Sequence, residues 1–368
     1  MKKINILILA VFALLLNSCK EPAVIEEATI DAEFNALFSP DSGGVTGADG
    51  TISVALPDGK SWFMMGDSFL GTVTDNVRSD ETFMMNNSFV EISADQKSAT
   101  ALYNGTYDQP ASYIVPPNHD IDSTWYWPGH GFVKDSIFHL FMSKFNHPGE
   151  GQWGFAFMNT DYLRYSWPQM ELLSNERFPF TDINKVHWGH AVLNDGEYVY
   201  IYGSRVEDTT GIFGMAKAHV MRAKINSAKT LEDFEFFNGT SWTSDPEASM
   251  GMEGISTNVS EQFTIFAYEN KYVMINHERG IGTTDIFSFV ADNPQGPWYN
   301  KQLLYQTTEH SKDKRIFSYN AMAHPQYIKD GKLLICYNIN SLEVPLVFED
   351  ARNYRPQFLR VDMNKIMP

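Results

Sequence analysis

The feature that most constrains this sequence is a hairpin pattern that occurs five times. Each copy holds an apolar strand, a tight polar turn and a second apolar strand, and all copies except the fourth open with an entry segment that contains glycine or histidine. The turns, such as PDGK and NDGE, carry the Asp, Asn and Gly residues that close short β-hairpins. The copies span residues 47–69, 128–145, 187–205, 261–279 and 320–340.

The spacing of the copies predicts a β-propeller. Successive copies begin roughly 60 to 80 residues apart, which leaves room for two further strands in each unit and therefore for a four-stranded blade. Strong helical periodicity is scarce, and five such units fill the chain. We therefore predict an all-β, five-bladed β-propeller that forms a single domain over residues 31–368, with a strand such as Pro356 to Val361 returning to close the ring.

The first thirty residues predict secretion and a lipid anchor. A short positive segment precedes an apolar run, residues 6–16, that is too short to cross a bilayer. Small and polar residues then lead to Cys19, a pattern typical of lipoprotein signals, although an ordinary signal peptide with an incidental cysteine is the alternative. We predict a signal over residues 1–19, a tether over 20–30, and a monomer anchored in a Gram-negative outer membrane or cell surface, facing the periplasm or the exterior.

The cysteine count and the net charge limit the disulfides that the chain can form and the classes of molecule that it can bind. Cys19 and Cys336 are the two cysteines, so lipidation of Cys19 would leave no internal disulfide, and the apolar surroundings of Cys336 predict a buried packing residue. The formal net charge of −17 disfavours nucleic acid and anionic membranes and fits a neutral glycan better than an anionic one. Arg352 and Arg355, near the C-terminus, are interpreted as rim or surface charges.

The predicted propeller gathers polar side chains at one face, because each first strand begins where its partner strand ends. Pairing the first hairpin about the DG pair of its turn places Gly50 opposite Asp67. The same pairing places Asp49 opposite Ser68, so that the two aspartates are neighbours. The other hairpins and the segment before the second one add the remaining candidates, which are Trp127, His130, His187, His190, Arg205, His277, Glu278, Asn320, His324 and Asn338.

Asp49 and Asp67 would supply the two carboxyl groups that glycoside hydrolysis usually needs. One carboxyl, with a raised pKa, protonates the leaving oxygen, and the other acts as nucleophile or activates water. Two neighbouring carboxylates raise the pKa of one of them. Glu278 is a further candidate catalytic acid, ahead of Glu261 and Glu253. The structural alternative is that Asp49 caps a turn and Asp67 binds backbone at a strand end.

The remaining residues of this face are candidate substrate-binding groups. Its histidines could bind sugar hydroxyls, tune a carboxylate or ligate a metal, and each is alternatively a wall residue with its hydrogen bonds satisfied. His187 and His190 are three positions apart, which puts them on opposite faces of a strand unless a bulge intervenes; we therefore predict no metal site. Trp127 is a candidate sugar-stacking residue. The assigned substrate-binding set is Trp127, His130, His187, His190, Arg205, His277, Asn320, His324 and Asn338.

Five segments resemble the DUF4185/DUF5005-type propeller lipoproteins of polysaccharide-degrading bacteria. They are GADGTISVALPDGKSWFMMGDSFLG, WPGHGF, HWGHAVLNDGEYVYIYGSR, NPQGPW and YNAMAHPQYIKDGKLLICYNINS, and the resemblance spans about residues 40–345. Such proteins are similar to the five-bladed arabinanases and arabinofuranosidases, and some of the DUF4185 group to endo-acting D-arabinanases.

The resemblance also implies roles for individual residues. Asp49 matches the base or nucleophile at the start of the innermost strand of the first blade. The next two acids of that clan are replaced here by His130 and by the pair His187 and His190, so that the proton donor comes from elsewhere or the chain does not catalyse. A Ca²⁺ ion in the central channel near His324 is compatible with the resemblance, although no cofactor is required.

These observations predict a glycoside hydrolase that acts on furanose-rich polysaccharide, of arabinan or arabinogalactan type, by acid/base catalysis with paired carboxylates. The alternative is a non-catalytic glycan-binding surface lipoprotein of a polysaccharide-utilisation system, which the replaced clan acids favour. A structural or protein-binding propeller ranks last, because it would carry an apolar or loop-dominated face rather than one rich in histidine and carboxylate.

Overall fold

The computed structural model describes residues 28–117, 123–151, 153–209 and 214–368, and within them the chain is nearly all β. The helices of this part are short: α1 (Ala32–Leu37), α2 (Glu309–Lys312), α3 (Pro345–Glu349), α4 (Met363–Ile366) and the 3₁₀ turns η1 (Pro246–Ala248) and η2 (Ala351–Tyr354). In these described ranges, no helix is both long and apolar enough to cross a membrane.

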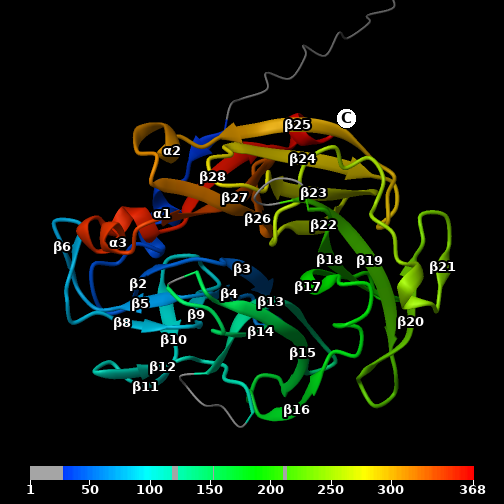
Figure 1. Ribbon diagram of the computed structural model, residues 1–368, viewed down its shortest axis with the longest axis horizontal. Coiled ribbons are helices and arrows are strands. Elements are labelled where there is room, and N and C mark those ends of the chain that lie inside the picture. Colours follow the sequence, from blue (N-terminus) through cyan, green and yellow to red (C-terminus); the bar gives the residue numbers. More distant parts are fainter. Residues whose placement is uncertain (1–27, 118–122, 152, 210–213) are drawn as a thin grey trace, which may run out of the picture.

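Five antiparallel sheets of four or five strands make up most of the fold (Figure 1). The first holds β3 (Ile52–Ala55), β4 (Ser61–Met65), β9 (Ser88–Ile92) and β10 (Ala99–Leu102). The second holds β13 (Thr124–Lys134), β14 (Ile137–Asn146), β15 (Ala156–Ser166) and β16 (Leu172–Arg177). The third holds β17 (His187–Asn194), β18 (Val199–Asp208), β19 (Met215–Ile225), β20 (Leu231–Phe237) and β21 (Trp242–Thr243).

The remaining two large sheets follow the same order. The fourth holds β22 (Thr264–Tyr268), β23 (Lys271–His277), β24 (Asp285–Ala291) and β25 (Trp298–Gln306). The fifth holds β26 (Ile316–Lys329), β27 (Lys332–Ser341), β28 (Gln357–Asp362) and β1 (Thr29–Ile30). All five hairpins predicted from the sequence are present, as the pairs β3–β4, β13–β14, β17–β18, β22–β23 and β26–β27.

The first strands of the five sheets contact one another in a closed cycle. β3 contacts β13, β13 contacts β17, β17 contacts β22, β22 contacts β26, and β26 returns to β3. Figure 1 shows these strands grouped near the centre, with the later strands of each sheet lying farther out. The prediction that the first strand of each hairpin is the innermost one is therefore confirmed.

The two ends of the described chain meet in the fifth sheet. β28 forms where a closing strand is predicted, and β1 pairs with its outer edge, Thr29 opposite Arg360. Asp31 caps α1 by accepting a hydrogen bond from the Phe34 amide (2.9 Å), and Arg360 donates to the same carboxylate (2.7 Å). This strand addition holds the first described residues against the last sheet.

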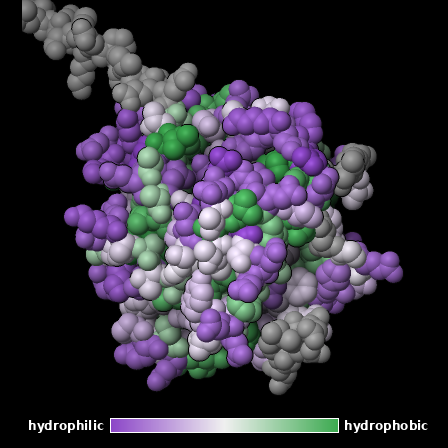
Figure 2. All heavy atoms as spheres, turned by 90° about the vertical axis from the view of Figure 1, so that its left-hand side faces the viewer, coloured by the Kyte–Doolittle hydropathy of each residue, from purple (hydrophilic) through white to green (hydrophobic). Residues whose placement is uncertain are grey.

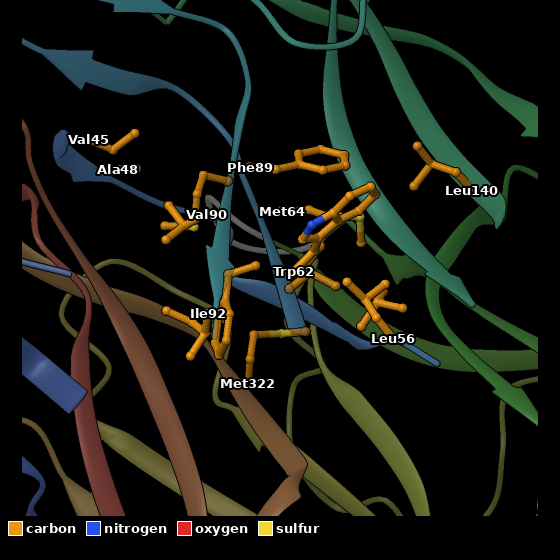
Figure 3. Packing of buried hydrophobic residues seen from close by; sticks show 14 of the residues in the cluster. Val45, Ala48, Leu56, Trp62, Met64, Phe89, Val90, Ile92, Leu140 and Met322 are labelled. Carbon is orange, nitrogen blue, oxygen red and sulfur yellow. The ribbon is translucent and has the colours of Figure 1, made fainter. Parts of the chain in front are cut away.

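The core fills the spaces between neighbouring sheets. In the cluster of Figure 3, Trp62, Phe89 and Ile92 from the first sheet pack with Leu140 of β14 and with Met322 of β26. All the residues of β4 are buried, because this strand lies between two others and is covered on both faces. Full burial of one large apolar side chain of this kind contributes about 2 kcal/mol.

Three smaller sheets lie beside the first large one, toward the left of Figure 1. They are formed by β2 (Val45–Ala48), β5 (Ser68–Leu70) and β8 (Phe83–Met85), by β6 (Val73–Thr74) and β7 (Val77–Arg78), and by β11 (Asn104–Thr106) and β12 (Gln109–Ala111). Cys336 is a free, fully buried cysteine as predicted, whereas Cys19 lies outside the described residues.

Candidate active site

The strands β2 and β5 bring Asp49 and Asp67 together. Ala48, the last residue of β2, pairs with Ser68, the first residue of β5, so that the aspartates that follow and precede them are neighbours. The Gly66 amide also donates to the Asp49 carbonyl oxygen (2.8 Å). The predicted neighbourhood is confirmed, but the predicted register is wrong by one residue, because the turn pairs Ile52 with Met64 and each first-strand residue therefore has a partner one position earlier than expected.

Gly66 leaves the space that the Asp49 side chain occupies. A β-carbon at position 66 would lie 2.3 Å from Asp49 Oδ1 and 3.8 Å from Cδ1 of Trp127. A side chain at this position would therefore displace the carboxylate. The sequence pattern GDS thus combines an aspartate with the small neighbour that the second aspartate requires.

Asp67 is a half-buried carboxyl with two donors. Trp127 Nε1 donates to Oδ1 at 2.8 Å, and Asn86 Nδ2 reaches the same oxygen at 3.4 Å. Burial raises the pKa of Asp67 to about 7, and the negative charge of Asp49 adds to the rise. The two hydrogen bonds lower this pKa but do not cancel the rise. Asp67 is therefore close to half protonated at neutral pH, as a general acid should be.

Asp49 lies close to the hydroxyl groups of two tyrosines. The Tyr319 hydroxyl donates to Oδ2 at 2.5 Å, and the Tyr354 hydroxyl acts with it to lower the pKa of the carboxyl. Burial raises the pKa of Asp49, and both tyrosine hydroxyls act against that rise. Of the two aspartates, Asp49 therefore has more support for its ionised form.

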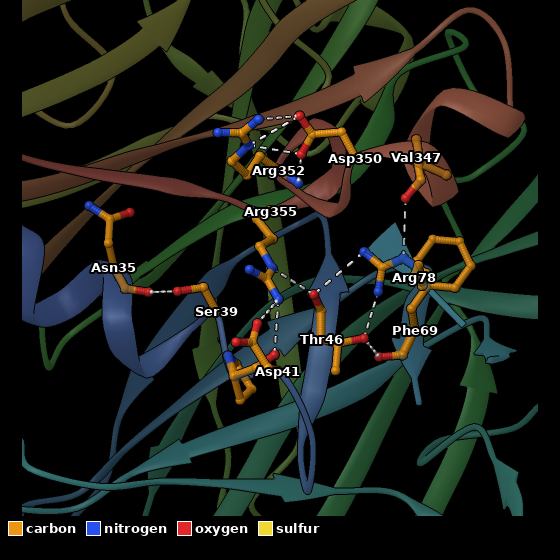
Figure 4. A network of polar contacts seen from close by, with 11 residues as sticks. Asn35, Ser39, Asp41, Thr46, Phe69, Arg78, Val347, Asp350, Arg352 and Arg355 are labelled. Carbon is orange, nitrogen blue, oxygen red and sulfur yellow. Dashed lines mark hydrogen bonds and ion pairs between the residues drawn. The ribbon is translucent and has the colours of Figure 1, made fainter. Parts of the chain in front are cut away.

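A polar network around Thr46 holds β2, the strand that ends just before Asp49 (Figure 4). Arg78 donates to the Thr46 hydroxyl (2.6 Å) and to the Val347 carbonyl (3.2 Å), and Arg355 donates to the Thr46 carbonyl (2.9 Å). The interpretation of Arg355 as a surface charge is wrong, since only 7% of it is exposed. Arg352 is an exposed partner of Asp350, as expected. The network ties β2 to α3 and to the segment that carries Tyr354.

An aromatic wall continues from Asp67 toward the third sheet. The ring of Trp127 lies 4.4 Å from that of Phe145 and 4.9 Å from that of Phe155. Phe145 in turn lies 5.7 Å from Phe157, whose ring centroid lies 3.7 Å from that of His187. The wall therefore connects the carboxylates with the predicted histidine pair.

His187 and His190 lie on the same side of their strand. A bulge separates Trp188 from Ala191 in the β17–β18 pairing, and Gly189 within it has φ +97°, so the rings come within 4.2 Å of each other. The sequence allowed this placement only if a bulge intervened, and the bulge is present.

The two rings differ in their partners. His187 Nε2 lies 2.7 Å from the Ser143 hydroxyl, whereas the buried Nε2 of His190 has no hydrogen-bond partner among the described residues. Burial lowers the pKa of His187 to about 3, with a further contribution from Arg279. Burial, then His187 and Arg279, lower the pKa of His190 well below its usual value. Both rings are therefore neutral at physiological pH.

His130 joins neighbouring sheets through the backbone. Its Nδ1 accepts from the Val192 amide (2.9 Å), and its Nε2 lies 3.2 Å from the Ser53 carbonyl oxygen. Burial lowers its pKa to about 4. Both ring nitrogens are thus engaged by protein groups.

The ring nitrogens of His324 and His277 are likewise engaged by protein groups. The ring nitrogens of His324 lie 2.8 Å from Ser53 Oγ and 3.2 Å from Cys336 Sγ. Those of His277 lie 3.1 Å from the Glu278 carbonyl oxygen and 3.4 Å from Ser318 Oγ. Burial lowers the pKa of His324 to about 3 and that of His277 to about 4.

The predicted asparagines lie in a hydrogen-bonded row, Asn320 near the start of β26 and Asn338 near the end of β27. Asn338 accepts from the Thr51 hydroxyl (2.7 Å) and donates to the Asn320 carbonyl (3.1 Å). The side chain of Asn320 accepts from Ser260 (2.7 Å) and donates to Gln262 (3.2 Å). These contacts link the first, fourth and fifth sheets.

Arg205 and Glu278 make their contacts with residues other than the two aspartates. Arg205 binds Asn184 and forms an ion pair with Glu207 (2.8 Å). Glu278 is half-buried, and its carbonyl oxygen accepts from the Thr283 hydroxyl (2.6 Å). Within the described part of the chain, no hydrogen bond or ion pair connects the Glu278 carboxylate with either aspartate.

The surroundings of His324 do not fit a calcium ion. Calcium takes six to eight oxygen ligands, whereas this ring contacts a hydroxyl, a thiol and the aromatic ring of Phe63 at 4.8 Å. In the described ranges, no group of three or more His, Cys, Asp or Glu side chains could hold a metal.

Three residues that sequence reasoning missed complete the site: Asn86, Tyr319 and Tyr354. Tyr319 directly precedes the predicted Asn320 and lies at the start of the same hairpin, so the pattern that located Asn320 could have found it. Asn86 and Tyr354 lie outside the repeated hairpins and give no comparable signal.

Comparisons with known proteins identify the family of this chain and solved structures of similar fold. Residues 31–364 match the family described as Domain of unknown function (DUF5005). A solved structure from Bacteroides ovatus ATCC 8483, named only as a candidate hydrolase, is 20% identical, with a TM-score of 0.74 over 91% of this chain and 90% of that one. Among curated proteins, no sequence matches.

Two further structures are more distant. The GH43_1 enzyme from Xanthomonas citri, complexed with xylotriose, is 12% identical, with a TM-score of 0.50 over 90% of this chain and 92% of that one. The exo-β-1,3-galactanase from Phanerochaete chrysosporium is 11% identical, with a TM-score of 0.50 over 90% of this chain and 64% of that one. The protein thus has the fold of a group that includes glycoside hydrolases. More narrowly, it belongs to the DUF5005 family.

Proposed function

We propose that this protein is a glycoside hydrolase built on a single-domain, five-bladed β-propeller and acting on furanose-rich polysaccharide of arabinan or arabinogalactan type. One observation carries the proposal: Asp67, with a pKa raised to about 7, lies beside Asp49, which two tyrosine hydroxyls support. The cyclic contacts of the first strands support the propeller. The enzymes of similar fold support the class of reaction, and the family resemblance of the sequence supports the sugar.

In the proposed reaction, protonated Asp67 donates its proton to the glycosidic oxygen while the bond to the anomeric carbon breaks. The Asp49 carboxylate then either attacks that carbon or removes a proton from an attacking water. Trp127 fixes the orientation of the acid through its 2.8 Å hydrogen bond, and the Tyr319 hydroxyl fixes that of Asp49. In the two-step route, Asp67 recovers a proton from the water that releases the sugar.

The test is a reducing-sugar assay on protein that begins near Lys20, with arabinan, arabinogalactan, xylan and β-1,3-galactan as substrates. Asp49→Asn and Asp67→Asn are the test variants. Asp58→Asn, an exposed aspartate in the turn of the first hairpin, is the matched control. We expect release by wild type and control and its collapse in both test variants. Equal release by all four proteins would exclude these carboxylates as the catalytic pair.

The second candidate is a glycan-binding surface lipoprotein without catalysis. It is favoured by the neutral, half-buried histidines at the places where the resembling clan has its next two acids. Binding of a polysaccharide without hydrolysis, equal in wild type and Asp49→Asn, would support it.

We also propose that Cys19 is lipidated and attaches a monomer to the outer membrane or cell surface of a Gram-negative bacterium. Incorporation of labelled palmitate into the wild-type chain, but not into Cys19→Ser, is the expected result. Labelling of both chains would contradict it.

A further inference from the structure

A surface cavity of about 440 Å³ lies among the small sheets that flank the first large one. It is bordered by Thr82 and Phe83 at the start of β8, by Tyr107 and Asp108 between β11 and β12, and by the acidic pair before β8, Asp80 and Glu81. The face that carries β6 and α3 is turned to the viewer in Figure 2, where apolar side chains lie among hydrophilic ones.

The lining combines two kinds of group that bind sugars. Phe83 and Tyr107 are 43% and 40% exposed, so their rings are available to stack on the apolar faces of sugar rings. The neighbouring carboxylates can accept hydrogen bonds from sugar hydroxyls. In addition, the buried Thr82 hydroxyl has no hydrogen-bond partner among the described residues, and a polar atom of this kind usually has one.

Two paired strands connect the cavity with the aspartates. β5 begins directly after Asp67 and ends before Gly71, which lines the cavity. β8 begins at Phe83 and ends before Asn86, the amide that reaches Asp67. Because an extended chain rises by about 3.3 Å per residue, the cavity lies roughly 13 Å from Asp67 along β5, a distance of a few sugar units.

We propose that this cavity is a distal subsite that binds a neutral, hydroxyl-rich glycan chain a few sugars away from the bond at Asp49 and Asp67. The proposal rests on the proposed function, since it extends the same glycan-binding site. Asp80, Glu81 and Asp108 give the subsite a negative charge, so it disfavours uronate-rich or sulfated chains. The subsite makes long chains better substrates than short ones.

The test is the double variant Phe83→Ala/Tyr107→Ala. Tyr299→Ala, which removes a comparably exposed tyrosine from β25 in the fourth sheet, is the control. For the double variant we expect kcat/KM on the polysaccharide to fall about tenfold, since two stacking contacts are lost, and kcat/KM on a disaccharide or an aryl glycoside to stay unchanged. Equal loss on long and short substrates, or no loss on either, would overturn the subsite.

Binding measurements separate this proposal from the proposed function. Titration calorimetry of the polysaccharide with Asp67→Asn, with and without the two alanines, measures the subsite without turnover. If wild type binds the glycan but hydrolyses nothing, and the double variant binds it about tenfold more weakly, the catalytic proposal fails and the subsite stands. If hydrolysis is confirmed and binding is equal in both, only the subsite fails, and tighter binding of polygalacturonan than of neutral chains would also overturn it. Binding of no glycan by any of these proteins would overturn both.

Discussion

Two sides of the polar face respond to burial in opposite ways. On the carboxylate side, formed by Asp49 and Asp67 with their donors, burial raises pKa values and brings that of Asp67 to about 7. On the histidine side, formed by His130, His187, His190, His277 and His324, burial lowers pKa values, to between about 3 and 4 where they are resolved.

The same physical cause therefore makes one side responsive to pH and the other inert. Desolvation disfavours the charged form of every group, and it shifts an acid upward into the physiological range but a histidine downward out of it. The comparison teaches that polar residues gathered at one face of a sheet fold can differ in kind: the carboxylate side is fitted for proton transfer, and the histidine side supplies neutral hydrogen-bonding groups that join the sheets.

The strongest test of this comparison replaces one titratable side chain on each side. Asp67→Asn should lower kcat about 10³-fold, because an amide cannot protonate the leaving oxygen, whereas His187→Gln should lower it less than tenfold, since the neutral ring has only a hydrogen bond to lose. Steady-state rates on the polysaccharide identified in the substrate panel give both values. A larger loss for His187→Gln than for Asp67→Asn would reverse the assignment of roles.

The fold was readable from the sequence because its information is local. Strand alternation and the Asp, Asn and Gly turns of each hairpin depend on residues close in sequence, and so does the neighbourhood of Asp49 and Asp67. The predicted register of the first hairpin was wrong by one residue. The geometry of the turn sets this register, because the hydrophobic pattern of a strand that is buried on both faces does not specify it.

The contacts that support the site could not be predicted from the sequence, because they join distant segments. Tyr319 reaches Asp49 across 270 positions of sequence, and Arg355 reaches Thr46 across 309. The Gly189 bulge that turns His190 toward His187 likewise has no signal beyond one glycine in a strand. Residue type and spacing indicate that a histidine lies at the face, but its partners decide whether it binds substrate or the protein itself.

The histidine side should matter more for stability. His324→Ala should lower the free energy of unfolding by about 3 kcal/mol, because it removes a fully buried ring that packs on Phe63 and leaves the Ser53 hydroxyl without that partner. Urea unfolding followed by circular dichroism measures the change. His147→Ala, an exposed histidine, is the control and should change stability by less than about 0.5 kcal/mol.

On the carboxylate side, a substitution that lowers activity should raise stability at high pH. The folded-state pKa of Asp67 lies above its ordinary value of 3.8, so the associated stability is fully present below pH 3.8 and is lost as the pH rises through about 7. Asp67→Asn cannot ionise and should be more stable than wild type at pH 8 by roughly 2 kcal/mol, a figure reduced because the Asp67 side chain is partly exposed to solvent.

Thermal and urea unfolding at pH 4 and pH 8 check this expectation. At pH 4 the two proteins should differ little, because Asp67 is protonated in the folded state of wild type. Asp58→Asn should follow wild type at both values. A variant that is less stable than wild type at pH 8 would show that the ionised Asp67 carboxylate is well solvated or well paired.

The pH profile of hydrolysis gives the finest comparison. Because the reaction needs Asp67 protonated, kcat/KM should fall about tenfold for each pH unit above 7. Because it needs Asp49 ionised, and the pKa of this group is also raised, activity should fall on the acid side as well. The histidines of the polar face should add no further step between pH 5 and 8, since burial keeps them neutral there. The two limbs of the pH profile belong to the coupled carboxyl pair rather than to either residue alone.

The variant Asp49→Asn separates the two pKa values. It removes the charge that contributes to the raised pKa of Asp67, so NMR titration of this variant should give a lower Asp67 pKa than wild type. An unchanged value would mean that burial alone sets the pKa of the acid, and that the two carboxylates act without electrostatic coupling.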